Sequence, residues 1–319
     1  MFFQKLPALI ANSIVLTISI YSTPASALDG GTLRVNPRNG WKAFEVISVG
    51  DNPAGDGFDW AMPGTFDGLG ALLVGSSTLR LQNNHEIGDA TISEVDIDLA
   101  NFKTAISNTI HSGSTGGGSF VTSARQAYDR WSSNGGTTWT NTSGPSNTSF
   151  ARFCSGQSYA PNTFGVGRGF VDDIYITGEE VGNGRLIALD LNNSDFYQLS
   201  GVAGDSSAAN GGIGGMPRDP WENAALLDTG EIDHVALLLS PDGGSSRMKL
   251  YIGEKGKGLD GSGSDDFLAR NGLAYGSYYY LNDLLPTVEG QISIDGTFDT
   301  TTAGALTASK SAPPAEPVA

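Results

Sequence analysis

Two apolar runs separated by a tight turn place the strongest local constraint on how this chain folds. The first run is DDIYIT (172–177) and the second is RLIALDL (185–191), with a Gly-Asn-Gly turn at 182–184. β-Branched residues on both sides of a glycine-containing turn are typical of two antiparallel strands. Glu179 and Glu180 follow the first run, so the sequence predicts two adjacent carboxylates at the end of a strand.

The same pattern recurs along the chain. HVALLLS (234–240) and RMKLYIGEKGKG (247–258) flank the turn sequence PDGGSS, which predicts a second hairpin with Glu254 at the end of its second strand. Two shorter β-like runs lie between 72 and 81, around Gly75. Together with 44 glycines, these runs predict a mainly β domain of many short strands.

Two segments instead carry apolar residues at helical spacing. The first contains Leu99, Phe102, Ile106 and Ile110, and the second contains Ala124, Ala127, Tyr128 and Trp131. Each set lies on one face of a helix, and Asp98 is the expected N-cap of the first. We expect both faces to pack against the core and not to bind a cofactor.

The two ends of the chain differ from the rest in composition. Lys5, an apolar run from 6 to 20 and the small residues Ala25-Ser26-Ala27 are typical of a signal peptide over 1–27. The run is too short to predict stable membrane insertion, so we expect an exported protein, periplasmic or extracellular. Residues 300–319 are mostly Thr, Ala, Ser and Pro and predict a disordered tail. A single domain is expected over 28–299, and its oligomeric state is left open.

Charge and motif content exclude several functions. A net charge of −16 argues against a nucleic-acid partner, which requires a basic face. The acidic surface is suited to binding cations, although it also favours solubility. Three histidines are too few for a histidine-rich two-zinc hydrolase. The chain has neither a G-x-S-x-G motif nor a G-x-x-x-x-G-K-[ST] phosphate loop, which argues against serine-hydrolase and nucleotide-hydrolase chemistry.

The polar motifs at predicted strand ends are candidates for chemistry. Cys154 has no disulfide partner in the chain, so it is a candidate metal ligand or nucleophile, or else a small buried apolar residue. Asn84 and Glu86 belong to an N-H-E sequence that offers an amide, an imidazole and a carboxylate, or simply caps a strand end. Glu222 follows Trp221, and Arg218 is a candidate phosphate contact or a surface ion-pair partner.

Four short motifs occur in one order: N-H-E at 84–86, C-S-G at 154–156, E-E at 179–180 and W-E-N at 221–223. In this order they resemble the PhoX-type alkaline phosphatases, a family of secreted bacterial β-propeller enzymes. The interval from Cys154 to Glu179 is longer than in the family pattern. The chain also stops before the further strands that close the family's propeller. The resemblance implies a β-propeller-like fold with helical and loop insertions that is incomplete at its C-terminus.

The resemblance also implies a function and a set of site residues. The expected activity is hydrolysis of a small phosphate ester, a phosphomonoester, at a site containing iron and calcium. Asn84 would position the substrate or a metal, and Arg218 would hold the phosphate. The implied metal ligands are Cys154, Glu86, Glu179, Glu180, Glu222 and Glu254.

Two other functions fit the sequence. One is a non-catalytic, calcium-stabilised extracellular β-propeller that acts as a binding or surface protein. The other is a propeller hydrolase of a different kind, such as a lactonase or a calcium phytase. The thiol of Cys154 distinguishes these other propeller hydrolases from the phosphatase, because an all-oxygen calcium site does not need it.

Overall fold

The computed structural model describes residues 39, 41, 45–52, 60–112, 120–142, 150–200, 216, 218–242, 248–281 and 298–299. The expected signal peptide (1–27) and tail (300–319) lie outside the described residues, so both stay predictions. In the part of the chain that the structure describes, no helix has the length and apolarity needed to cross a membrane.

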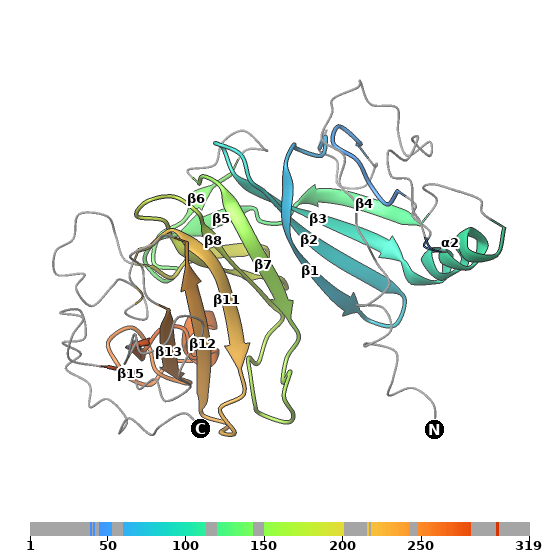
Figure 1. Ribbon diagram of the computed structural model, residues 1–319. Coiled ribbons are helices and arrows are strands. Elements are labelled where there is room, and N and C mark those ends of the chain that lie inside the picture. The colour runs from blue at the N-terminus through green and yellow to red at the C-terminus, as the bar shows by residue number, and fades with distance from the viewer. Residues whose placement is uncertain are drawn as a thin grey trace, which may run out of the picture. The chain divides into compact units, whose positions relative to one another are not determined.

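The fold is mainly β, as predicted, and its strands form three open sheets (Figure 1). The first sheet has the order β1(Phe66–Val74), β2(Thr78–His85), β3(Thr91–Asp98), β4(Val121–Gln126). The second has the order β6(Thr140–Asn141), β5(Arg130–Ser132), β10(Asp195–Gln198), β9(Leu186–Asp190), β8(Ile174–Glu179), β7(Phe153–Tyr159). The third has the order β11(Trp221–Leu227), β12(His234–Pro241), β13(Lys249–Glu254), β14(Gly276–Leu281), β15(Phe298–Asp299). The described helices are α2(Leu99–Ser112) and α3(Phe267–Arg270).

The chain forms two compact units whose segments alternate along the sequence. The first comprises the described residues of Met1–Phe66, Leu73–Arg80 and Val95–Arg125. The second comprises those of Asp67–Leu72, Leu81–Glu94 and Gln126–Ala319. The single domain expected over 28–299 stays a prediction.

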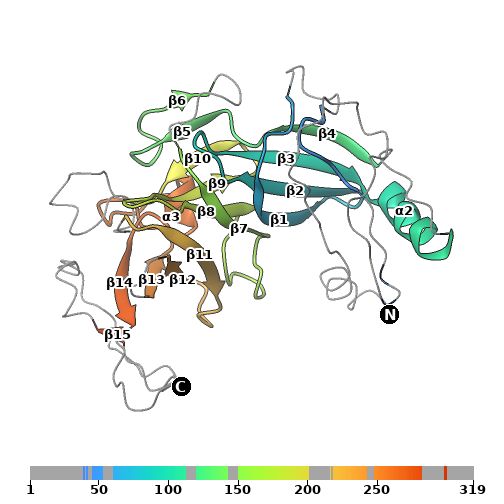
Figure 2. The same cartoon turned by 45° about the horizontal axis from the view of Figure 1, so that its top comes forward.

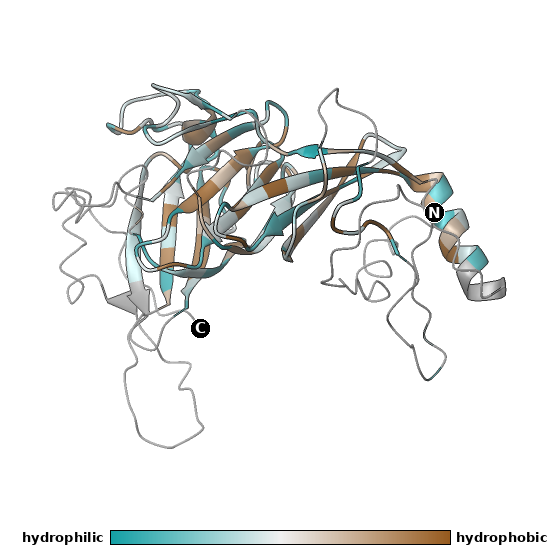
Figure 3. Ribbon diagram, turned by 90° about the horizontal axis from the view of Figure 1, so that it is seen from above, coloured by the Kyte–Doolittle hydropathy of each residue, from teal (hydrophilic) through white to brown (hydrophobic). Residues whose placement is uncertain are grey.

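In the first unit, α2 confirms the first predicted helix. The Asp98 carboxylate accepts a hydrogen bond from the backbone N–H of Asn101 at 2.7 Å, which is the expected N-cap. Phe102 is buried and packs on Phe120 with ring centroids 5.2 Å apart. Hydrophilic and hydrophobic residues are interspersed along this helix (Figure 3). The helix is therefore amphipathic, as its sequence spacing predicts.

The prediction of the second helix is wrong, because its residues belong to β4, to β5 and to the link between them. Tyr128 is buried and stacks on Phe196 with ring centroids 4.4 Å apart, and Trp131 pairs with Phe196 across β5 and β10. The apolar spacing has a different origin: Ala127, Tyr128 and Trp131, in the link and on β5, all pack in one core cluster with Phe196. Tertiary packing overrides the local pattern here.

Both predicted hairpins in the second unit are confirmed. β8 and β9 pair antiparallel with Gly178 opposite Leu186, and the turn between them contains Asn183 at φ 68°. β12 and β13 pair antiparallel with Leu237 opposite Tyr251. β8 is apolar without alternation because both of its faces are covered: Ile174 and Ile176 enter one core cluster and Tyr175 enters another.

A β-bulge in β7 is the local feature that shapes the candidate site. Phe153 pairs with Glu179 and Gly156 pairs with Thr177, so Cys154 and Ser155 together oppose the single residue Gly178 of β8. β11 contacts both β7 and β8, as Figure 2 also shows. This approach requires glycine at 178, because a Cβ there would lie 2.4 Å from the Cβ of Trp221. The bulge and the close approach bring β7, the end of β8 and the start of β11 together.

Candidate metal centre

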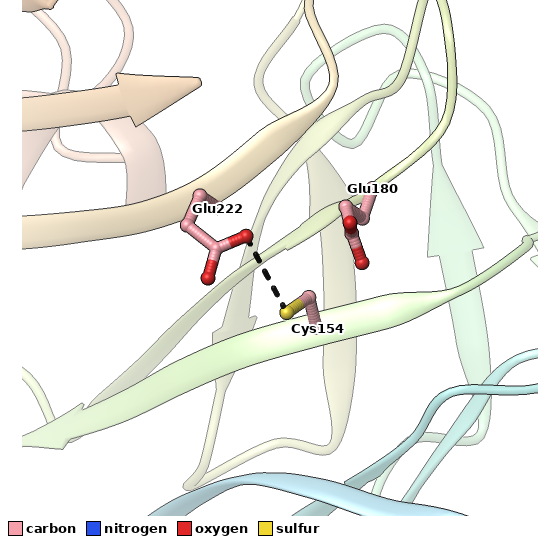
Figure 4. A group of neighbouring side chains, drawn as sticks. All are labelled: Cys154, Glu180 and Glu222. Atoms are coloured by element: carbon pink, nitrogen blue, oxygen red, sulfur yellow. Dashed lines mark hydrogen bonds between the residues drawn. The ribbon is translucent and has the colours of Figure 1, made fainter. Parts of the chain in front are cut away.

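Three of the predicted ligands come together in the second unit. Cys154 on β7, Glu180 directly after β8 and Glu222 on β11 each offer one ligand atom, and these atoms all lie within 4.8 Å of one another (Figure 4). The Cys154 thiol points at Glu222, with Sγ 3.8 Å from Oε2. Cys154 is half-buried and Glu222 is exposed, so the group is open to solvent. We call these three residues the Cys154 cluster.

The bulge explains how β7 presents two consecutive side chains to β11. In a regular strand, neighbouring side chains point to opposite faces of the sheet. Here the Cys154 thiol meets the Glu222 side chain, and the Ser155 hydroxyl donates a hydrogen bond to the Glu222 carbonyl oxygen. Two residues of β7 therefore hold one residue of β11.

Asn84 lies behind the bulge and supports it. It is fully buried, and its Nδ2 donates to the carbonyl oxygen of Cys154 at 2.6 Å and to that of Ser155 at 3.1 Å. Nδ2 also donates to Thr177 Oγ1 at 2.8 Å, while Oδ1 accepts a hydrogen bond from the Tyr175 hydroxyl at 2.9 Å. The amide is fully used by the protein, and its hydrogen bonds support Cys154 and Ser155; its predicted role in positioning substrate or metal stays a prediction.

Three further carboxylates surround the cluster. Asp67 at the start of β1 interacts with Glu86 and with the Cys154 thiol, and Asp242 after β12 interacts with Glu180. Burial raises the pKa of Asp67, and the negative charge of Glu86 and Glu222 raises it further. The Asp67 side chain was not predicted as a site residue. Its sequence context, an aspartate in an acidic, glycine-rich stretch, is indistinguishable from that of solvated turn residues.

The accumulated negative charge also acts on the thiol. Burial raises the pKa of Cys154 to about 12, and the neighbouring carboxylates of Asp67 and Glu222 add to the shift. Burial likewise raises the pKa of Glu180, against the lowering effect of Arg152. A cation placed among these groups would relieve the repulsion and would favour the thiolate. The donor set of one thiol and several carboxylate oxygens therefore fits a bound metal ion.

Glu86 and Glu180 share one cationic partner, Arg152. Its Nη2 lies 2.7 Å from Glu86 Oε1 and 3.1 Å from Glu180 Oε2. Glu86 is thus connected to the Cys154 cluster through the arginine and through Asp67, although it is not a member of the group within 4.8 Å. We place Glu86 at the edge of the candidate centre.

Glu179 lies elsewhere, although it is adjacent to Glu180 in sequence. Its carboxylate is buried and accepts hydrogen bonds from Arg185 Nε at 2.5 Å and Nη2 at 2.7 Å, and from the Ala151 backbone N–H at 2.8 Å. The Arg185 guanidinium also packs over the Phe150 ring at 4.2 Å. Glu179 therefore neutralises Arg185, whose side chain is only 12% exposed, and Glu180 is the glutamate of this pair that belongs to the Cys154 cluster.

Arg218 and Glu254 are not brought to the Cys154 cluster. Arg218 donates to the carbonyl oxygen of Asn183 at 3.4 Å, and burial lowers its pKa, as does the nearby charge of Arg185. Glu254 pairs with His234 at one end of the β12–β13 ladder, whereas Trp221 pairs with Pro241 at the other end of β12. At about 3.3 Å per residue, seven residues of β12 separate Glu254 from the Glu222 region by roughly 20 Å.

Comparisons of the chain with models of known protein families, with curated proteins and with solved structures found no match. The resemblance to the PhoX-type phosphatases therefore rests on the four short motifs alone. The structure brings one residue of three of these motifs into the Cys154 cluster and places the fourth motif, N-H-E, behind it and at its edge.

Proposed function

We propose that the Cys154 cluster binds a metal ion and that the protein is an exported hydrolase acting there on phosphomonoesters. The observation that carries the proposal is the convergence of one thiol and two carboxylates within 4.8 Å, at the meeting point of three strands that are distant in sequence. The phosphate-ester specificity comes from the resemblance of the motifs.

The spacing of the ligand atoms is suited to a single ion. Metal–sulfur and metal–oxygen bonds of about 2.0–2.3 Å place ligand atoms on opposite sides of an ion up to about 4.5 Å apart. Small side-chain rotations therefore bring all three atoms into the coordination sphere. A thiolate with carboxylates fits iron, which the resemblance implies. Asp67 and Glu86, which interact with each other, offer only oxygen ligands, and these suit calcium.

A bound metal would polarise the phosphoryl oxygen and offset the negative charge that develops during hydrolysis. The chain's own residues hold and orient the ligands. The bulge aims Cys154 and Ser155 at β11, Asn84 fixes the bulge from behind, and Arg152 screens Glu86 from Glu180. Because these roles differ, replacing a ligand, Asn84 or Arg152 should each change a different measured property.

The strand order agrees with a propeller-like architecture. Each of the three sheets contains four strands that are consecutive in sequence and adjacent in space: β1 to β4, β7 to β10 and β11 to β14. Four-stranded sheets of this kind are the blades of β-propellers, whose first strands line the central channel. Asp67, Cys154 and Glu222 all lie on first strands, namely β1, β7 and β11. We therefore propose that the three sheets are propeller blades.

The test is turnover of p-nitrophenyl phosphate by the chain from residue 28, purified and supplied with iron and calcium. Glu180→Gln and Glu222→Gln should each lower kcat/KM at least a hundredfold, because each removes a charged ligand. Glu231→Gln is the matched control, since Glu231 is exposed in the β11–β12 turn. Calcium binding without any turnover would instead support the non-catalytic binding protein and would refute the phosphatase.

A further inference from the structure

Arg152 is held in one position by both its side chain and its backbone. Its Nε and Nη2 donate to Glu86 Oε1 at 3.0 and 2.7 Å, and Nη2 also donates to Glu180 Oε2 at 3.1 Å. Its backbone N–H donates to the Ile87 carbonyl at 2.9 Å, and its carbonyl accepts from the Glu180 N–H at 2.8 Å.

The backbone at Arg152 adopts a conformation that a large side chain normally avoids. Its φ is 50°, in the left-handed region, where a residue other than Gly, Asn or Asp is uncommon. Such strain persists only where the surroundings enforce it, and it is concentrated at functional sites. Two backbone hydrogen bonds, one at the N–H and one at the carbonyl of Arg152, enforce it here.

One nitrogen of the guanidinium, Nη1, remains available for a ligand. Nε and Nη2 face the two glutamates, while Nη1 has no hydrogen-bond partner among the residues that the structure describes. About half of the side chain, 49%, is exposed. Because Glu180 also belongs to the Cys154 cluster, the guanidinium that carries Nη1 lies one carboxylate away from the candidate ion.

We propose that Arg152 binds the anionic oxygens of the substrate's phosphoryl group beside the metal ion. The proposal rests on the proposed function and assigns the anion-binding role to Arg152 in place of Arg218. A planar guanidinium that is anchored on one edge by carboxylates presents its other N–H groups in a fixed direction, which suits a tetrahedral oxyanion. The two glutamates prevent the arginine from swinging away when the site is empty.

The experiment compares Arg152→Met with wild type in metal-loaded protein, using inorganic phosphate as the probe in isothermal titration and as a competitive inhibitor of p-nitrophenyl phosphate turnover. Phosphate affinity should fall about 10- to 100-fold, the loss expected for a hydrogen bond to a charged group. KM should rise in parallel, with a smaller change in kcat. Arg168→Met is the control, because Arg168 is an exposed arginine paired with Asp228 at 2.9 Å.

Metal affinity separates this role from a structural one. Removing Arg152 leaves Glu86 and Glu180 without their cation, so metal affinity should stay equal or rise while phosphate affinity falls. A residue that only maintains the fold would lower both together. Unchanged phosphate affinity, or a joint loss of metal and phosphate, in a folded and active background would overturn the proposal.

Arg152→Lys keeps the test decisive if the methionine variant does not fold. Lysine retains one charge for the glutamates but lacks the planar guanidinium and its Nη1 donor, so phosphate affinity should fall several-fold with metal content unchanged. Phosphate affinity equal to that of wild type would contradict the assignment. Wild-type protein that takes up no metal and hydrolyses nothing would refute the proposed function itself, and this inference with it.

Discussion

The side-chain amide of Asn84 donates a 2.6 Å hydrogen bond to the carbonyl oxygen of Cys154, and this contact connects a buried polar residue to the only thiol of the chain. Asn84 is fully buried, with both ends of its amide used. A bulge leaves strand carbonyls outside the regular ladder, and such buried groups need partners. Asn84 supplies them, which makes the bulge a stable feature of β7.

Replacing Asn84 should therefore destabilise the second unit. Asn84→Asp removes the Nδ2 donor and places a carboxylate against the carbonyl oxygens of Cys154 and Ser155. We expect a loss of about 3 kcal/mol in the free energy of unfolding, measured by urea denaturation. Tyr175→Phe removes only the hydroxyl that donates to Asn84 and should cost about 1 kcal/mol. Equal stabilities of the two variants would contradict the supporting role of Asn84.

The close approach of β11 to β8 makes a second prediction. A Cβ at Gly178 would lie 2.4 Å from Trp221 Cβ, whereas a Cβ at Gly182 would meet nothing within 4 Å. Gly178→Ala should lower the unfolding free energy by about 1–3 kcal/mol, the usual cost of overpacking. It should also weaken metal binding, because Glu222 follows Trp221 on the strand that is displaced. Gly182→Ala should leave both quantities nearly unchanged, and a similar effect of the two changes would argue against the observed packing.

The same substitution should affect different properties at the adjacent residues Glu179 and Glu180: stability at the first and metal binding at the second. Glu179→Gln leaves the largely buried Arg185 without its carboxylate and should cost about 3–5 kcal/mol of stability. Glu180→Gln should change stability by no more than about 0.5 kcal/mol but should remove a metal ligand. Urea denaturation and metal titration of both variants measure the two effects. Metal loss that is equal in both folded variants would restore Glu179 as a ligand.

The high pKa of Cys154 predicts slow alkylation of the metal-free protein. With a pKa of about 12, the thiol is protonated throughout the neutral range, and its reactive thiolate fraction at pH 8 is about 10⁻⁴. The rate of reaction with iodoacetamide should increase about tenfold per pH unit from pH 8 to 10. A model thiol with a pKa of about 8.5 instead reaches a plateau above pH 9. A plateau for Cys154 near pH 9 would show that burial and the carboxylates do not raise its pKa.

Local patterns in the sequence predicted the strands well where turn chemistry marks their ends. The β8–β9 and β12–β13 hairpins, the strands on either side of Gly75 and the Asp98-capped helix are all present. The helix expected around Ala127 is wrong, because a link and the short strand β5, which both pack around Phe196, carry the same spacing of apolar residues. Only the tertiary contacts distinguish the two structures.

The site was predictable in its centre but not in its surroundings. Cys154, Glu180 and Glu222 were identified from short motifs, and they do converge. The separation of Glu179 from Glu180 depends on a largely buried arginine six residues further along the chain, and the role of Asn84 depends on a bulge. Neither the pairing of a carboxylate nor the register of a strand is encoded in a short motif. Asp67 lies beside the cluster because of the tertiary fold, and no short motif marks it in the sequence.

The most direct test of the account is whether the Cys154 thiolate coordinates a metal ion. The chain from residue 28 would be titrated with cobalt(II) as a spectroscopic probe and analysed for iron and calcium as purified, in parallel with Cys154→Ser. The account predicts a sulfur-to-metal charge-transfer band and bound iron in wild type, both absent in the serine variant, whose fold is retained. A folded wild-type protein with no such band, and with the same metal content as Cys154→Ser, would show that the cluster is not a metal centre.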